Sequence, residues 1–309
     1  MSQILVSGSI AHDYIMSYND NFKNAISINN VDSINWNMLI SEMKKETGWT
    51  GLNIAYNLAM LWENAVLLGS IWNDFIFDWL LDKINLNHIY KSKRFLTASA
   101  YVTNDKNWNQ MNVFYPWAMM DSDKTSINDI KTKISHAMIS PNQKEAMIKH
   151  LKEAKEKNIK TFFDPGQILP LFSKKELIES SKNASYLIAN QNEFEKYQKM
   201  TDQDEIELLN DYEKIIVTLG SKWSKIIDKS WVTRIDAIKV EKVIDPTWAW
   251  DSYRAWLLKW LTMWHNFEIW AKIWSIVSSY CVQFEWWQNH FVNMDIIEKD
   301  LKKYFDIKI

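Results

Sequence analysis

The hydrophobic and polar positions alternate in short blocks along the chain, and these blocks predict strands and helices in turn. Apolar, β-branched runs such as "QILVSGSI", "NAVLLGSI", "KTFFDP", "ASYLIAN" and "KIIVTLG" predict strands. Amphipathic blocks lie between several of these runs, for example "NQKEAMIKHLKEAKEKN" and "QNEFEKYQKM", and their spacing predicts helices. Strands that alternate with helices predict a mostly parallel sheet covered on both faces. We therefore expect one α/β domain over residues 1–309.

Other blocks complete this expected architecture. Residues 37–47 and the block "DFIFDWLLDKI" are predicted to be helical, as is the segment after "TGWTGL". The segments "TASAYVTN" and "MNVFY" alternate apolar and polar positions around the turn "DKNWNQ", which predicts a hairpin in a small appended sheet. A second hairpin is expected at 225–240, followed by two helices that run to about residue 284.

Composition limits the kind of protein and its partners. Of the 309 residues 47% are apolar and 24% are charged, which is enough for a folded chain with a large core. The net charge of −2 argues against a nucleic-acid partner or an anionic membrane surface. The lone cysteine, Cys281, excludes an intramolecular disulfide, and the chain has no apolar run of membrane-spanning length. We expect a cytoplasmic protein with no membrane contact.

The usage of tryptophan and glycine is unusual. The chain has 18 Trp and 6 Gly, and together they fill 24 positions, close to the ordinary glycine share of about 7%. Many of the Trp stand in turn-like contexts such as "DSINWN", "DKNWNQ" and "DKSWVT". One interpretation is a binder with an aromatic surface. We favour another, that most Trp stand where the working protein has Gly, as when a UGA codon that the cell decodes as glycine is translated as tryptophan.

Candidate chemistry lies directly after the predicted strands, where parallel α/β sheets bind their ligands. The polar residues and glycines at these places are Asp13, Asn53, Asp164, Asn190, Glu193, Thr218, Gly220 and the segment 245–251. The chain contains no G-x-x-x-x-G-K-[ST], no H-E-x-x-H, no paired cysteines and no G-x-S-x-G. Zinc, metalloprotease and serine-hydrolase functions therefore lack support.

The segment "DPTWAWDSYRAW" at 245–256 carries the most specific signal. With glycine at its Trp positions it begins D-P-T-G-A-G-D and opens an apolar helix. A small-residue turn at a helix N-terminus presents unpaired N–H groups and the positive end of the helix dipole to an anion. Asp251, just inside this turn, would act as a base for a hydroxyl beside the anion. The alternative is an ordinary helix start with Asp251 as a first-turn charge.

This segment resembles the D-T/P-T-G-A-G-D motif of the ribokinase-like, or PfkB, family of carbohydrate and nucleoside kinases. "GSIAHDYIM", "TGWTGLNIA", "NQNE" and "TLGSKW" match further family motifs in the family's order, so the resemblance spans residues 4 to about 290. The chain looks most similar to the bacterial adenosine kinases that are built like sugar kinases. The resemblance implies a three-layer α/β/α fold with a mostly parallel central sheet and a small β-sheet lid, formed by segments of roughly 13–35 and 95–118.

The resemblance also implies roles for individual residues. Asp251 would take the proton from the 5′-hydroxyl, and the backbone of Trp248, Ala249 and Trp250 would form an anion hole. The implied substrate-binding residues are Asp13, Gly48, Trp49, Asn53 and Phe114. The implied ATP-binding residues are Asn190, Thr218, Gly220 and Trp223, and Glu193 would hold Mg²⁺ through water. Two alternatives remain open: Asp13 as a simple strand end, and Asn190 with Glu193 as a capping box without a ligand.

The implied function is ATP-dependent and Mg²⁺-dependent phosphorylation of a nucleoside, with adenosine favoured. One departure is Ala100, which stands where the most similar kinases carry an aromatic residue, so a two-sided base sandwich is in doubt. The alternatives are a ribokinase or fructokinase of the same family and, if the Trp are real, a catalytically dead binding relative. No motif in the sequence supports a scaffold function. The partner is a small nucleoside or sugar, and a homodimer is compatible with the resemblance.

Overall fold

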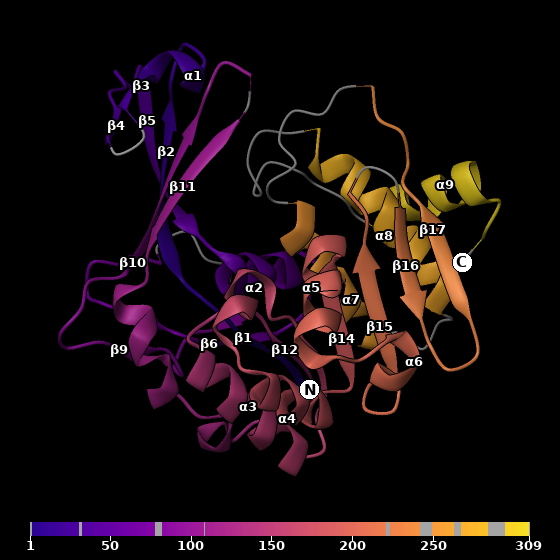
Figure 1. The fold of residues 1–309 in the computed structure, drawn as a ribbon. Helices are drawn as coiled ribbons and strands as arrows, with labels where there is room; N and C mark the ends of the chain where they lie inside the picture. The colour runs from indigo at the N-terminus through magenta and orange to yellow at the C-terminus, as the bar shows by residue number, and fades with distance from the viewer. Residues whose placement is uncertain are drawn as a thin grey trace.

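A nine-stranded sheet forms the centre of the computed structural model, which describes residues 2–30, 33–77, 82–107, 109–220, 223–241, 249–262, 267–283 and 294–308 (Figure 1). In spatial order its strands are β17 (Val232–Asp236), β16 (Trp223–Ile227), β15 (Lys214–Thr218), β14 (Tyr186–Asn190), β13 (Lys160–Phe163), β12 (Ile134–Ile139), β1 (Gln3–Ser7), β6 (Ala65–Leu68) and β8 (Ile84–Asn85). The strands from β15 to β8 are parallel, and β16 and β17 form an antiparallel edge.

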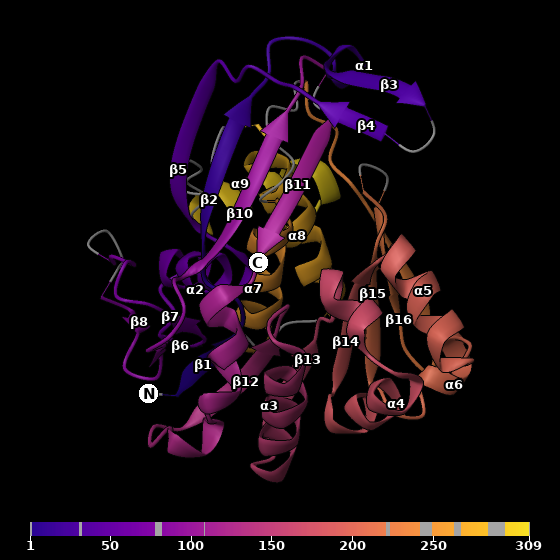
Figure 2. The same cartoon turned by 60° about the vertical axis from the view of Figure 1, so that its left-hand side comes forward.

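Helices cover both faces of this main sheet (Figure 2). On one face α3 (Lys144–Glu156), α4 (Lys174–Asn183) and α5 (Gln191–Thr201) share a buried cluster with β13 and β15. On the other face α2 (Thr50–Met60), α7 (Ala249–Thr262) and α8 (Phe267–Cys281) share a second cluster with β1 and β6, and α9 (Met294–Phe305) packs on α8. The expected three-layer α/β/α fold is confirmed. Within the described ranges, no helix is long and apolar enough to cross a membrane.

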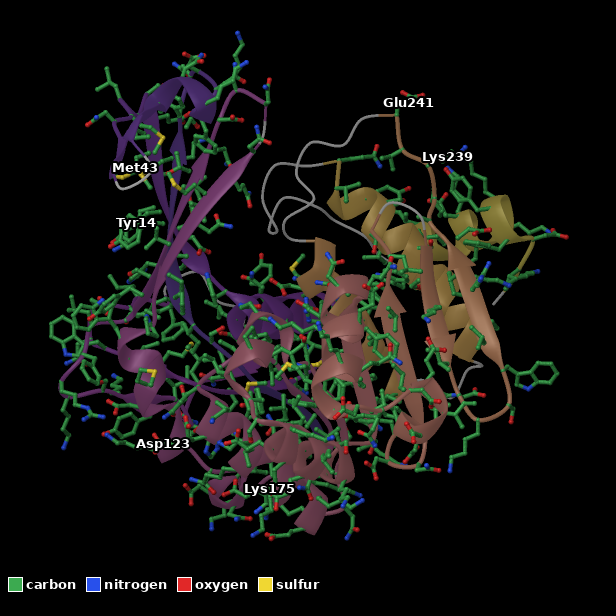
Figure 3. The ribbon with its side chains drawn as sticks, viewed as in Figure 1. Tyr14, Met43, Asp123, Lys175, Lys239 and Glu241 are labelled. Carbon is green, nitrogen blue, oxygen red and sulfur yellow. The ribbon has the colours of Figure 1, made fainter. Side chains whose placement is uncertain are left out.

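A second, four-stranded sheet, called here the small sheet, lies beyond one side of the main sheet (Figure 1). Its order is β11 (Gln110–Tyr115), β10 (Ala98–Asn104), β2 (Ala11–Ser17) and β5 (Glu42–Gly48). The predicted hairpin is confirmed, since β10 and β11 pair antiparallel. Tyr14 of β2 points to the outer side of the small sheet (Figure 3). Because side chains alternate along a strand, its neighbour Asp13 faces the inner side.

Short elements complete the described part of the chain. They are α1 (Phe22–Ala25), the pair β3 (Ile26–Asn30) and β4 (Ser33–Trp36), the pair β7 (Ser70–Ile71) and β9 (Tyr90–Lys91), α6 (Glu205–Leu208), and 3₁₀ turns at Trp117–Lys124, Ile127–Asp129 and Gly166–Leu171. The hairpin expected at 225–240 corresponds to β16 and β17.

Two helix predictions were wrong. The segment 37–47 contains β5, which pairs antiparallel with β2 along its whole length, so sheet pairing overrides the helix preference of its Lys and Glu residues. In the block 74–84, residues 74–77 are not helical and Ile84 begins β8. There the Asp74 carboxylate accepts hydrogen bonds from Thr97, which ties the segment to the start of β10. Residues 78–81 of that block lie outside the described residues.

Candidate active site

The candidate base, Asp251, lies in the first turn of α7, where α7 packs against α2. Its side chain is buried, and the residue is 7% exposed. Asn53 of α2 is fully buried and its Nδ2 donates to Asp251 Oδ2 at 2.8 Å. Ser252 Oγ also donates across the two helices to Asn57 Oδ1, at 2.9 Å. These polar contacts fix the start of α7 against α2 and set the position of the carboxylate.

The surroundings of Asp251 shift its pKa toward neutrality. Burial raises the pKa, the Arg254 guanidinium and the Asn53 hydrogen bond lower it, and the charge of Asp164 raises it, so that it lies at about 6. A base is most effective when its pKa lies near the working pH. Asp251 therefore has the burial and the ionisation expected of a base that accepts a proton from an alcohol.

Arg254 is a site residue that the sequence interpretation missed. Its Nε donates to Asp164 Oδ2, and its Nη1 lies 3.4 Å from Asp251 Oδ1. Asp164 directly follows β13 and is fully buried. The available signal was the spacing, since Arg254 stands three residues after Asp251 and therefore shares its face of the helix. Arg254 thus connects Asp164, which the sequence places only after a strand, to the candidate base Asp251.

Three predicted substrate-binding residues converge beside the base. Gly48 ends β5, and a Cβ built there would lie 2.9 Å from Asn53 Oδ1 and 3.1 Å from Asp13 Oδ2. Both of these oxygens are buried and have no hydrogen-bond partner in the described part of the chain. Buried acceptors without a partner are rare in folded proteins, so these two neighbouring oxygens mark a candidate ligand position.

The pKa of Asp13 is shifted by burial and by its neighbours in this site. Burial raises its pKa, a hydrogen bond from the indole of Trp49 lowers it, and the nearby charges of Asp251 and Glu46 raise it again, to about 8. The structure therefore places Asp13 within electrostatic reach of the candidate base. Asp13 lies within β2, in register with Ala100 of β10 and Glu46 of β5, so it is more than the end of a strand.

Trp49 and Phe114 meet over this group. Their rings stack with centroids 3.9 Å apart and an interplanar angle of 14°. Ala100 pairs with Phe114 on one side and with Asp13 on the other, so the three side chains form a row on the inner side of the small sheet. Because Trp49 contacts both Asp13 and Phe114, its indole occupies the space between them. The structure thus brings together all the predicted substrate residues and fills the gap between them with tryptophan.

The predicted ATP-binding residues form a second group at the ends of β14 and β15. Asn190 and Thr218 are paired neighbours in the sheet, and Thr218 Oγ1 donates to the Ala189 carbonyl at 3.3 Å. Gly220 has φ of +64°, a backbone conformation that suits glycine, and no atom of the described residues other than its chain neighbours lies within 4 Å of a Cβ built on it. Trp223 begins β16.

Asn190 and Glu193 form a capping box. Asn190 Oδ1 accepts from the Glu193 N–H, and Glu193 Oε2 accepts from the Asn190 N–H, both at 2.9 Å. Burial and the charge of Asp164 raise the pKa of Glu193, and Arg254 opposes this rise. The charges of Asp164 and Arg254 therefore act on both Glu193 and Asp251.

The described ranges hold no group of three or more His, Cys, Asp or Glu residues that could bind a metal ion directly. Since one Glu193 oxygen is engaged in the cap, the residues present fit Mg²⁺ through bridging water rather than through a cage of protein ligands.

The predicted anion hole is described in part. Ala249 and Trp250 are the first two residues of the 14-residue helix α7, and Trp248 lies outside the described residues. The first N–H groups of a helix have no partner within it, and the dipole makes that end positive. The backbone at Ala249 and Trp250 therefore has the expected polarity for binding an anion beside Asp251.

The fold and this site together define a ribokinase-like phosphotransferase for small alcohols. The nucleoside kinase of Methanocaldococcus jannaschii is 29% identical to this chain over 98% of both chains. The solved structure of that archaeal member of the ribokinase family superposes with a TM-score of 0.84 at 28% identity, covering 98% of this chain and 99% of the other. The Burkholderia thailandensis nucleoside kinase in complex with inosine has a TM-score of 0.86 at 25% identity and covers 99% of both chains.

The family model of the pfkB family carbohydrate kinases matches residues 24–283. The chain therefore belongs to the PfkB family and is an ATP-dependent kinase. The family suggested by "DPTWAWDSYRAW" and the motifs before it is confirmed.

Proposed function

We propose that this chain transfers the γ-phosphoryl group of ATP to the 5′-hydroxyl of a nucleoside, with adenosine as the favoured acceptor. The observation that carries the proposal is the buried Asp251 at the start of α7, which accepts a hydrogen bond from Asn53 and lies within electrostatic reach of Asp13. One buried oxygen each of Asn53 and Asp13 has no hydrogen-bond partner in the described part of the chain. The full-length similarity to two nucleoside kinases supports a nucleoside as acceptor.

The ribose would bind between α2 and the small sheet. Asp13 Oδ2 and Asn53 Oδ1 supply two neighbouring acceptors, a suitable pair for the two hydroxyls of a vicinal diol. Gly48 lets the sugar approach both of them, because any side chain there would meet these oxygens. Phe114 offers a ring on which the base can stack, and the small sheet would act as a lid over the acceptor.

In the transfer itself, the 5′-oxygen forms a bond to the γ-phosphorus as the bond to the leaving ADP oxygen breaks, and Asp251 accepts the hydroxyl proton. The N–H groups at Ala249 and Trp250, with Trp248, would stabilise the charge on the phosphoryl oxygens. Asn190, Thr218, Gly220 and Trp223 would line the ATP site. Mg²⁺, held by Glu193 through water, would neutralise phosphate charge when bound.

A sugar kinase is the second candidate, and Ala100 favours it. Ala100 leaves one aromatic ring, Phe114, on this row of the small sheet, so a base would be stacked on one side only. A ribose or fructose acceptor needs no base sandwich. One-sided stacking also accommodates more than one purine, so inosine is a natural comparison with adenosine.

An assay of ADP release tests the proposal. Adenosine, inosine, ribose and fructose are offered to the chain as printed and to a variant with glycine at Trp49, Trp248 and Trp250. We expect nucleosides to stimulate ATP turnover above both sugars in the glycine variant. Turnover with sugars alone would establish the second candidate, and no stimulation by any acceptor in either protein would refute both. Sedimentation of the same samples tests the predicted homodimer.

A further inference from the structure

A buried charge cluster surrounds the candidate base and extends beyond the predicted site. Arg254 lies between two carboxylates, Asp164 and Asp251, and its side chain is 14% exposed while that of Asp164 is fully buried. Its positive charge also acts on Glu193 at the start of α5. The Asp13 carboxyl of β2 also interacts electrostatically with Asp251. The Arg254 guanidinium therefore interacts with three carboxyls, those of Asp164, Asp251 and Glu193, which come from three separate segments of the chain.

The two oxygens of the Asp251 carboxylate have different partners. Oδ2 accepts from Asn53, and Oδ1 faces Arg254 Nη1. Arg254 is itself held by the bond from its Nε to Asp164, which is anchored at the end of β13 by its own N–H donating to the Ile139 carbonyl. A planar guanidinium held at one edge presents its other edge in a fixed direction. The main sheet thereby sets the orientation of a side chain on α7.

We propose that Arg254 is a positioning residue for the proposed transfer: held by Asp164, it fixes the Asp251 carboxylate and balances its charge. This inference rests on the proposed role of Asp251 as base. Without Arg254 the buried Asp251 carboxylate would lie near Asp164 and Asp13 with no cation among its described contacts, so it would hold its proton to higher pH and turn more freely.

Kinetics over a range of pH test this role in Arg254→Gln, Arg254→Lys and Asp164→Asn. Lys259→Gln is the matched control, because Lys259 lies on the same helix, pairs with Glu63 and is similarly buried. We expect Arg254→Gln to lower kcat roughly 10- to 100-fold with little change in KM, and to move the acid limb of kcat to higher pH. Arg254→Lys should recover the position of the limb. Asp164→Asn should move the limb to lower pH, because it removes a negative charge.

The control should lose stability and leave the limb in place. A loss of folded protein in Arg254→Gln, with an unchanged limb and kcat in the folded fraction, would assign Arg254 a structural role and overturn the proposal. Titration of the Asp251 carboxyl carbon by NMR, assigned with Asp251→Asn, gives a readout that needs no turnover. If neither this chain nor its variant with glycine at Trp49, Trp248 and Trp250 shows kinase activity, the proposed function fails, and the NMR titration still decides whether Arg254 holds the Asp251 carboxylate ionised.

A second inference comes from the backbone. Six non-glycine residues in the described ranges have positive φ. Three are Asn158, Asp202 and Asp306, residue types that tolerate this region. The other three are Trp49, Trp62 and Trp117, with φ of 71°, 62° and 32°. A bulky side chain is strained at positive φ, and glycine is the residue that adopts it freely.

Trp62 shows the pattern most clearly. It follows α2 in a Schellman motif, in which Glu63 N–H donates to the Leu58 carbonyl at 3.0 Å and Trp62 N–H to the Ala59 carbonyl at 3.1 Å. The left-handed position of this motif is the commonest place for a helix-ending glycine. Trp62 is 80% exposed, so its side chain gains little from packing there.

Trp49 combines the same strain with a blocked site. Its φ of 71° and ψ of 161° lie in a region that is almost restricted to glycine, and its indole fills the gap between Asp13 and Phe114. Near Trp117 the ring of Tyr115 has its centroid at 3.5 Å, closer than aromatic pairs normally pack. We infer that the working protein has glycine at Trp49, Trp62 and Trp117.

The intact mass of the protein isolated from its native source tests this inference directly. Glycine at these positions lowers the mass by a large step for each residue, and peptide sequencing locates each one. A protein that carries Trp at all three would overturn the inference. As a physical test, Trp62→Gly should raise the midpoint of thermal unfolding, whereas Trp231→Gly should not. Trp231 is 76% exposed and has no positive φ. Equal effects of the two changes would contradict the strain argument.

Discussion

Replacing the candidate base by asparagine should remove activity and increase stability. In Asp251→Asn the proton acceptor is lost, and general base catalysis contributes about 10²- to 10⁴-fold to a rate, so kcat should fall by that factor with KM little changed. The folded protein raises the pKa of Asp251 from 3.8 to about 6, mainly by burial. This difference corresponds to at most about 3 kcal/mol of unfolding free energy, which asparagine would regain.

The size of this stability gain depends on pH. Because the pKa of Asp251 is raised on folding, the ionised carboxylate destabilises the folded state, and wild-type protein loses stability as the pH rises from about 4 to about 6. Asp251→Asn should therefore be more stable than wild type above pH 6, and the two should converge below pH 4. Chemical denaturation at several pH values, with kcat measured in parallel, checks both parts.

Asp121→Asn is the matched control, with the opposite expected sign. Asp121 is also buried, but it accepts bonds from Arg94, Lys124 and Ser92, and these partners lower its pKa to about 2. Its loss should destabilise the protein at neutral pH, an effect that fades as the pH falls from about 4 to about 2. If Asp251→Asn were destabilising at pH 7, or retained wild-type kcat, the assignment of Asp251 as a buried base would be refuted.

Three further variants test the acceptor site in the steady-state assay. Asp13→Ala should raise KM for the nucleoside by roughly 10- to 100-fold with little change in kcat, because it removes a buried acceptor for a ribose hydroxyl; an unchanged KM would remove Asp13 from the site. Phe114→Ala should raise KM for adenosine, by up to about 100-fold, and leave KM for ribose unchanged, since base stacking contributes about 1–3 kcal/mol; equal effects would argue against stacking. Trp49→Gly should lower KM for every acceptor, because it opens the gap beside Asp13; a higher KM would mean that the indole belongs to the site.

The order of strands and helices could be predicted because most elements bury one face in a continuous core. The helix α3 and the strand β15, for example, have regular apolar periods, and both lie where the sequence placed them. The strand β5 could not be predicted in this way, since its residues "EMKKETG" are polar and exposed at most positions. Its conformation comes from pairing with β2, a contact between segments about 30 residues apart that no local pattern records.

Some residues of the candidate site could likewise be predicted from local motifs, and others could not. Asp251, Asn53 and Asp13 follow recognisable local motifs, and the structure brings them together as expected. Arg254 carries no motif of its own. Its importance follows from the approach of β13 to α7, which sets Asp164 against its guanidinium. The positive φ of Trp62 could not be predicted from the local sequence either, because it depends on the hydrogen bonds that end α2.

The most direct test of the central claim is the identity of the product. The protein with glycine at Trp49, Trp248 and Trp250 is incubated with ATP and adenosine, and the product is examined by mass spectrometry and ³¹P NMR. We predict the 5′-monophosphate of adenosine, formed in step with ADP and formed about 10²- to 10⁴-fold more slowly when Asp251 is replaced by Asn. Formation of ADP without a phosphorylated nucleoside, or an undiminished yield from the Asp251→Asn protein, would contradict the account.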